Sequence, residues 1–141
     1  MNVLEETDIS LQPRQERPVR ALVVDDSPLA RDAIRVLLES RPEVEIVGFA
    51  ADGEEAVAQT ETLCPDLVLM DIQMPKLDGL RATRMVRESF PEIRVIIVTV
   101  NHGVEVYQSC LSSGADGLVT KDRLYQDLLT EIRRVFPSQP P

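Results

Sequence analysis

Five short apolar runs alternate with five stretches of helical periodicity, and this alternation limits the fold more than any other feature of the chain. In order, the strand-like and helix-like segments are 20–25, 27–39, 45–50, 54–63, 66–71, 77–89, 94–99, 104–112, 117–120 and 123–136. The runs are apolar throughout rather than at every second position, which is typical of strands covered on both faces. Strands that alternate with helices predict a parallel sheet, and right-handed crossovers place helices on both faces. We therefore predict a doubly wound α/β fold with five strands.

Polar side chains follow four of the five predicted strands. Asp25 and Asp26 end the first strand, Asp71 the third and Thr99 the fourth, and Lys121 follows the fifth. The carboxyl ends of parallel strands meet at one edge of the sheet, where ligands bind in open α/β folds. Clustered carboxylates repel one another and need a cation, and oxygen ligands suit Mg²⁺. A carboxylate beside Mg²⁺, an ammonium and a hydroxyl can accept a phosphoryl group as a nucleophile.

Each of these residues alone is weak evidence, because strands often end in polar side chains. Four strand ends together favour a site over a purely structural explanation. Nucleotide hydrolysis is disfavoured because no glycine-rich phosphate loop follows the first predicted strand. Acyl transfer is disfavoured because there is no Ser-His-Asp arrangement. A phosphatase with an aspartate nucleophile is also disfavoured, because Asp71 is followed by Ile72 and Gln73 and not by a second aspartate two positions on.

The segments around these residues resemble the receiver domains of two-component response regulators, including those of chemotaxis. The matching segments are Val23–Ser27, Leu67–Gly79, Val98–Thr99 and Gly114–Lys121. The resemblance extends from about residue 20 to about residue 135. It implies a flavodoxin-like (βα)5 fold whose sheet has the strand order 2-1-3-4-5.

The resemblance also implies a metal site. Asp26 would bind Mg²⁺ directly, and Asp25 would complete the acidic pocket in part through water. Asp71 would contribute a carboxylate oxygen, and Gln73 would contribute its backbone carbonyl.

The same resemblance assigns the chemistry. Asp71 would accept a phosphoryl group from the phosphohistidine of a histidine kinase or phosphotransfer protein, Thr99 would hydrogen-bond that group, and Lys121 would pair with it. Pro75 and Gly79 would fix the loop after the site. The family's chemistry is self-directed phosphoryl transfer and slow autodephosphorylation, so we expect a signalling switch and not an enzyme.

Three positions depart from the family pattern. Leu118 stands where an aromatic residue is usual, three positions before Lys121. Val100 follows Thr99 where a small residue is typical, and its branched side chain is hypothesised to crowd the phosphoryl site. Asp122 replaces the frequent proline after the lysine, and this Lys-Asp pair is more typical of receivers with a helix-turn-helix output domain.

The sequence leaves open how a phosphorylated receiver would pass on its signal. The chain is either a single-domain regulator that acts by protein contact or the receiver part of a longer regulator, and a homodimer is plausible for the family. A phosphate-independent interaction module is the alternative, favoured by Leu118 and Val100 but disfavoured because all the site residues are present.

Composition and boundaries complete the prediction. We expect a flexible extension over residues 1–18, one receiver domain over 19–136, and a tail or linker start over 137–141. The net charge of −9 argues against direct nucleic-acid contact by this chain. No apolar run approaches the roughly 18 residues that span a membrane, and the N-terminus has no signal core, so we expect a cytoplasmic protein.

Four remaining side chains are predicted to lie outside any site. Cys64 and Cys110 are expected as small buried or half-buried apolar residues, with no disulfide or metal role. His102 is expected as a solvated loop residue, and Tyr107 as a packing residue.

Overall fold

A single parallel sheet organises the protein. The computed structural model describes residues 17–100 and 103–137. Its sheet has the order β2-β1-β3-β4-β5, and all neighbouring strands pair in parallel. The strands are β1 (Val19–Val24), β2 (Val44–Ala50), β3 (Leu67–Met70), β4 (Arg94–Thr99) and β5 (Gly117–Thr120). The predicted fold class and strand order are confirmed, with strand bounds within one residue of those expected.

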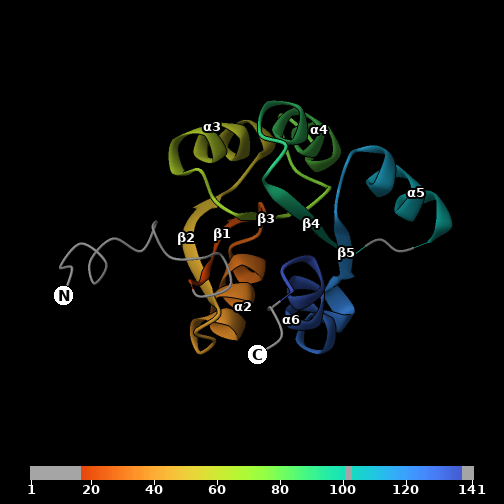
Figure 1. Cartoon of the computed structure of the whole chain (residues 1–141). Coiled ribbons are helices and arrows are strands. Elements are labelled where there is room, and N and C mark those ends of the chain that lie inside the picture. Colours follow the sequence, from red (N-terminus) through yellow and green to blue (C-terminus); the bar gives the residue numbers. More distant parts are fainter. Residues whose placement is uncertain (1–16, 101–102, 138–141) are drawn as a thin grey trace.

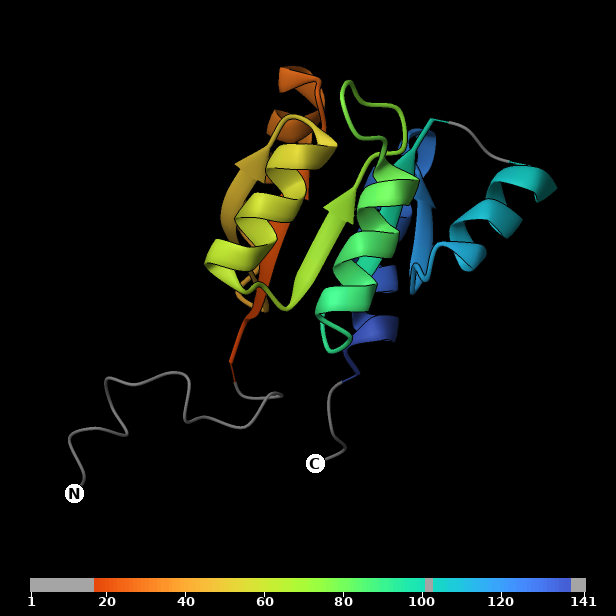
Figure 2. The ribbon, with the colours of Figure 1, turned by 90° about the horizontal axis from the view of Figure 1, so that it is seen from above.

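Helices cover both faces of the sheet (Figure 1). One face carries α2 (Pro28–Glu39) and α6 (Leu124–Val135). The other face carries α3 (Gly53–Leu63), α4 (Gly79–Ser89) and α5 (Val104–Ser112). A short 3-10 turn, η3 (Lys121–Arg123), joins β5 to α6, so the last predicted helix begins one residue later than expected. In Figure 2 the strand arrowheads point the same way, which brings the carboxyl ends to a common edge.

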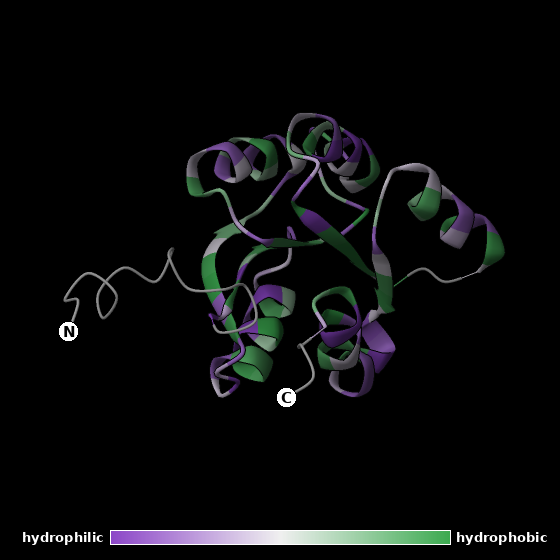
Figure 3. Ribbon diagram, viewed as in Figure 1, coloured by the Kyte–Doolittle hydropathy of each residue, from purple (hydrophilic) through white to green (hydrophobic). Residues whose placement is uncertain are grey.

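Two hydrophobic clusters lie on opposite faces of the sheet, and successive residues of each strand alternate between them. Ala21 and Val23 of β1 pack toward α2 and α6, while Leu22 and Val24 pack toward α3 and α4. All four side chains are at most 1% exposed. Figure 3 shows the resulting apolar sheet between helices of mixed polarity. This double coverage explains why the strands are apolar at every position.

Polar side chains start three helices at the carboxyl edge of the sheet. Ser27 accepts a hydrogen bond from the amide of Ala30 and is the N-cap of α2. Asp52 and Asp78 cap α3 and α4 in the same way. Each cap satisfies an amide that the helix itself leaves without a partner. The caps thereby fix where the loops of this edge turn into helices.

One minor prediction is wrong and others lie outside the described residues. Cys64 is exposed, because it ends α3 in a left-handed conformation with φ of 47°. Cys110 is buried as predicted. His102, residues 1–16 of the predicted extension and residues 138–141 of the predicted tail lie outside the described residues. Among the described helices, none combines the length and the apolar character needed to span a bilayer.

Candidate functional site

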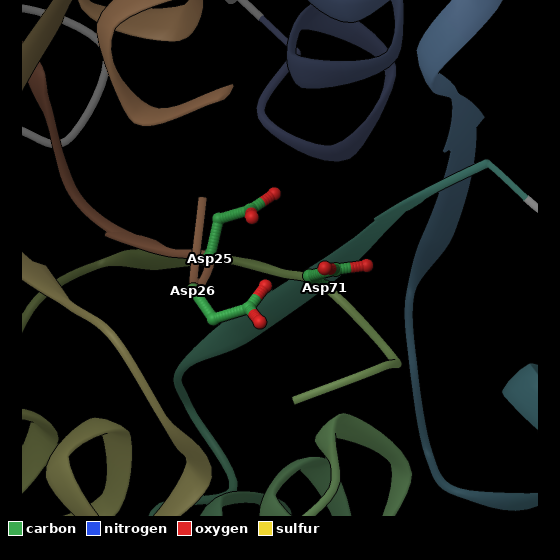
Figure 4. A group of neighbouring side chains, drawn as sticks. All are labelled: Asp25, Asp26 and Asp71. Carbon is green, nitrogen blue, oxygen red and sulfur yellow. The ribbon is translucent and has the colours of Figure 1, made fainter. Parts of the chain in front are cut away.

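Three aspartate side chains meet at the carboxyl edge of the sheet. The parallel register pairs Val24 of β1 with Met70 of β3, so the residues that follow each strand end lie at the same level. The amide of Asp71 donates to the carbonyl of Val24 at 3.0 Å and secures this alignment. Carboxylate oxygens of Asp25, Asp26 and Asp71 all lie within 4.8 Å of one another. Figure 4 shows the three side chains as neighbours at the ends of β1 and β3.

The ammonium of Lys121 lies against the two buried members of this cluster. Its Nζ is 2.6 Å from Oδ2 of Asp25 and 3.4 Å from Oδ2 of Asp71. Lys121 is positioned by η3, directly after β5, and 23% of its side chain is exposed. Asp26 is exposed, so the cluster opens to solvent on that residue's side. The Lys121 ammonium therefore faces two of the three carboxylates.

The surroundings shift the protonation equilibria of Asp71 and Lys121. Burial raises the pKa of Asp71, repulsion from Asp25 raises it further, and Lys121 and the amide of Ile72 only partly oppose this. Burial alone would lower the pKa of Lys121, but its hydrogen bonds and attractions to Asp25 and Asp71 outweigh burial and raise it. In the protein without a metal ion, the charged form of Asp71 is therefore less favourable than it is for a free aspartate.

The chemistry of the donors fits a hard divalent cation. Asp25 Oδ2 is buried against the Lys121 ammonium, 2.6 Å away, and the same ammonium also faces Asp71. One ammonium shared by two buried carboxylates does not balance their charge, and an uncompensated buried charge is costly. Three carboxylates, one of them exposed, offer the oxygen ligands and the open side that suit Mg²⁺ with several bound waters. The residues present therefore fit Mg²⁺.

Two other predicted site residues are carried to the same edge. Thr99 ends β4, is fully buried, and lies in register with Thr120, the neighbour of Lys121. Gln73 is exposed in the loop between β3 and α4, two residues after Asp71.

Arg31 belongs to the site's immediate support but was not identified from the sequence. Its guanidinium, on α2, donates to the backbone carbonyl of Asp25 at 2.6 Å. The amide of Ser27 donates to Oδ1 of the same aspartate at 2.9 Å. Together these bonds hold the turn that carries Asp25 and Asp26. The available signal was the position of Arg31 one helical turn after the Ser27 cap, where a long side chain can reach back to the strand end.

The positions that depart from the family pattern lie beside the site or behind it. Val100 is 59% exposed, and its predicted crowding effect stays a prediction. Leu118 is partly buried against the α4 and α5 side of the sheet. It borders a cavity of about 350 Å³ between α5, β5 and α6, which Tyr107 also lines. Tyr107 is 52% exposed, so it packs only in part.

Comparison with known protein families decides the assignment. Residues 21–133 match the response regulator receiver domain. The chain belongs to this family. This receiver domain is 33% identical over 124 residues to the nitrate/nitrite response regulator NarL of Escherichia coli, covering 88% of the chain and 57% of NarL. It is 40% identical over 121 residues to the response regulator GacA of Pseudomonas viridiflava, covering 86% of the chain and 56% of GacA. The receiver thus spans little more than half the length of these relatives.

Solved structures agree with the family assignment. The response regulator domain of Thermotoga maritima CheB aligns with a TM-score of 0.80 and 35% identity, over 88% of this chain and 100% of that domain. The receiver domain of the putative response regulator NarL of Mycobacterium tuberculosis aligns with a TM-score of 0.81 and 28% identity, over 87% and 99% of the two chains. The chain is therefore a two-component receiver in both sequence and fold. Receivers are generally signalling switches and not enzymes.

Proposed function

We propose that this receiver accepts a phosphoryl group on Asp71 from the phosphohistidine of a histidine kinase or phosphotransfer protein, in the presence of Mg²⁺. The observation that carries the proposal is the convergence of Asp71, two further carboxylates and the Lys121 ammonium at one edge of the sheet. Asp25 and Asp71 are both buried and both face the ammonium, at 2.6 and 3.4 Å. Asp71 is the one that follows the central strand, β3, between β1 and β4.

The two oxygens of Asp71 have different surroundings, and this supports their different roles. Oδ1 accepts a hydrogen bond from the amide of Ile72 at 2.8 Å, which fixes the carboxylate. Oδ2 faces Lys121. We assign the nucleophilic role to Oδ2, because the ammonium beside it can neutralise charge on a phosphoryl group bound there. Thr99 is the proposed hydrogen-bond donor to that group.

Asp25, Asp26, Asp71 and the backbone carbonyl of Gln73 are the proposed ligands of Mg²⁺. When bound, the ion would offset the charge that develops on the transferring oxygens. The chain's own contribution is to hold the carboxylates within 4.8 Å of one another and to keep Lys121 beside them.

The proposed output is a change in protein contacts after phosphorylation, in the cytoplasm. We place the receiver domain at residues 19–136, with flanking segments 1–18 and 137–141. The relatives NarL and GacA extend well beyond the part that this chain matches. Together with the Lys121-Asp122 pair, this supports a helix-turn-helix output domain in the same regulator. The net charge of −9 argues against nucleic-acid contact by this chain itself. A receiver homodimer is compatible with this scheme.

Chemical trapping tests the assignment of Asp71. An aspartyl phosphate is an acyl phosphate, which borohydride reduces to the alcohol, homoserine. The protein is incubated with acetyl phosphate and Mg²⁺, reduced, digested and sequenced by mass spectrometry. We expect homoserine at position 71. Homoserine at position 25 or 26, or at none of the three, would contradict the proposal.

A further inference from the structure

Gly79 lets the two ends of the loop after Asp71 lie close together. The amide of Gly79 donates to the carbonyl of Ile72 at 2.9 Å, so residues 72–79 form a closed loop. A Cβ at Gly79 would lie 1.7 Å from the carbonyl oxygen of Asp71. Only a glycine lets the two ends of the loop approach this closely.

A second glycine, Gly53 at the start of α3, lies against the backbone of the same loop. Gly53 is the first residue of α3, and a Cβ there would lie 1.9 Å from the carbonyl oxygen of Leu77 and 2.6 Å from its carbonyl carbon. These are backbone atoms, so the contact cannot be relieved by rotating a side chain. Gly53 does not have a positive φ, so its backbone would accept alanine. The close approach of the loop is therefore the reason that this position needs glycine.

Asp52 holds the loop at its turn. Its Oδ1 accepts a hydrogen bond from the amide of Glu55 at 2.8 Å and so caps α3. Its Oδ2 lies 3.6 Å from Nζ of Lys76. Lys76 has φ of 68°, a left-handed conformation that is uncommon for a residue with a side chain. One carboxylate thus joins the start of α3 to the strained turn of the loop.

We propose that Asp52 and Gly53 form a seat for residues 71–79 and that this seat sets the Mg²⁺ affinity of the site. Both are positioning residues that touch no reacting group. The inference rests on the proposed function, in which Asp71 and the Gln73 carbonyl bind the ion. Mg²⁺ requires near-ideal octahedral geometry at about 2.0–2.1 Å, so a shift of the loop weakens its binding. The seat acts through Leu77, which lies in the loop between Gln73 and Gly79.

Isothermal titration of the full chain with MgCl₂ tests the seat, with Gly53→Ala compared to Gly48→Ala. Gly48 lies in β2 behind the same helix, where a Cβ would meet only the ends of side chains, the closest being Cδ1 of Leu63 at 2.7 Å. Both substitutions add one methyl group beside α3, and both are expected to lower the melting temperature. We expect Gly53→Ala to raise the Mg²⁺ dissociation constant about tenfold, as loss of support behind metal ligands typically does. Gly48→Ala should change it less than about twofold.

Lys76→Gln and Asp52→Asn provide a second route that does not depend on a steric clash. The Lys76 side chain is 60% exposed, and asparagine is a good N-cap, so both variants are expected to fold. Removing this partly exposed ion pair is expected to raise the Mg²⁺ dissociation constant about twofold in each variant, with no further rise in the double variant.

The outcomes separate the seat from the proposed function. Wild-type protein that binds Mg²⁺ and is labelled at Asp71, with Gly53→Ala binding equally well, would overturn the seat alone. Wild-type protein that neither binds Mg²⁺ nor is labelled overturns both. If Gly53→Ala does not fold, unchanged Mg²⁺ affinity in both Lys76→Gln and Asp52→Asn overturns the seat.

Discussion

Replacing Asp71 by asparagine should make the metal-free protein more stable, because this carboxylate is buried among like charges. One of its oxygens lies within 4.8 Å of an oxygen of Asp25 and of an oxygen of Asp26. At an effective dielectric constant of about 20, each repulsion amounts to about 3.5 kcal/mol at that distance, less for the exposed Asp26. At the same dielectric constant, the attraction between Asp71 and the Lys121 ammonium, 3.4 Å apart, stabilises the carboxylate by about 5 kcal/mol. The desolvation of a buried carboxylate adds to the repulsion, and we expect a net stabilisation of about 1–2 kcal/mol.

The sign follows from the raised pKa of Asp71. The folded protein binds the Asp71 proton more tightly than the unfolded chain, whose carboxyl has a pKa near 3.8. As the pH rises from that value through the raised folded pKa, the wild type loses stability relative to Asp71→Asn. The difference between the two proteins should therefore be small near pH 4, grow with rising pH, and level off above the folded pKa.

Thermal unfolding in EDTA measures this difference. With a change of about 4 °C per kcal/mol for a domain of this size, Asp71→Asn should melt about 4–8 °C above the wild type at pH 7. Mg²⁺ at ten times its dissociation constant should then stabilise the wild type by about 1.4 kcal/mol and narrow the gap.

Asp66→Asn is the matched control, because Asp66 precedes β3 and Asp71 follows it. Asp66 accepts a hydrogen bond from the amide of Arg20 at 2.9 Å and lies 3.5 Å from Arg17, so its replacement should destabilise the protein by about 1 kcal/mol. Asp71→Asn that melts at or below the wild-type temperature in EDTA would refute the electrostatic reasoning.

Three further predictions follow from the same contacts. Lys121→Met leaves Asp25 and Asp71 without their cation, and urea unfolding in EDTA should show a loss of about 3–5 kcal/mol that Mg²⁺ partly restores. Arg31→Met removes the bond to the Asp25 carbonyl, and calorimetric titration should show weaker Mg²⁺ binding with about 1 kcal/mol less stability. Leu128→Ala in the fully buried core should cost about 2–5 kcal/mol in urea unfolding while Mg²⁺ affinity stays at the wild-type value. Unchanged stability in Lys121→Met would contradict the first assignment, and unchanged Mg²⁺ affinity in Arg31→Met the second. Lost Mg²⁺ affinity in Leu128→Ala would contradict the third.

The fold was predictable because its signals are local in sequence. Continuous apolar runs identify strands covered on both faces, and β1 with its alternating contacts to two clusters shows why. The predicted helix over 27–39 agrees with α2 because its start depends on neighbouring residues, the Ser27 cap and Pro28. The convergence of Asp25, Asp26 and Asp71 was predictable as well, since parallel strands place their carboxyl ends together.

The supports behind the site were missed for two different reasons. The bond from Arg31 to the Asp25 carbonyl is local, and it was missed because a long side chain on the first turn of a helix can point in several directions. The closeness of Gly53 to Leu77 depends on how α3 and the loop before α4 pack, and neither sequence segment signals it. Cys64 was expected to be buried from its residue type, whereas its left-handed position at the end of α3 exposes it.

Intact mass spectrometry of the wild type and Asp71→Asn after incubation with acetyl phosphate tests the central claim most directly. With Mg²⁺, the wild type should gain the mass of one phosphoryl group, and it should gain none in EDTA. Asp71→Asn should gain none in either condition. No gain in folded wild-type protein at saturating Mg²⁺, or an equal gain in Asp71→Asn, would contradict phosphorylation at Asp71 and favour a phosphate-independent interaction module.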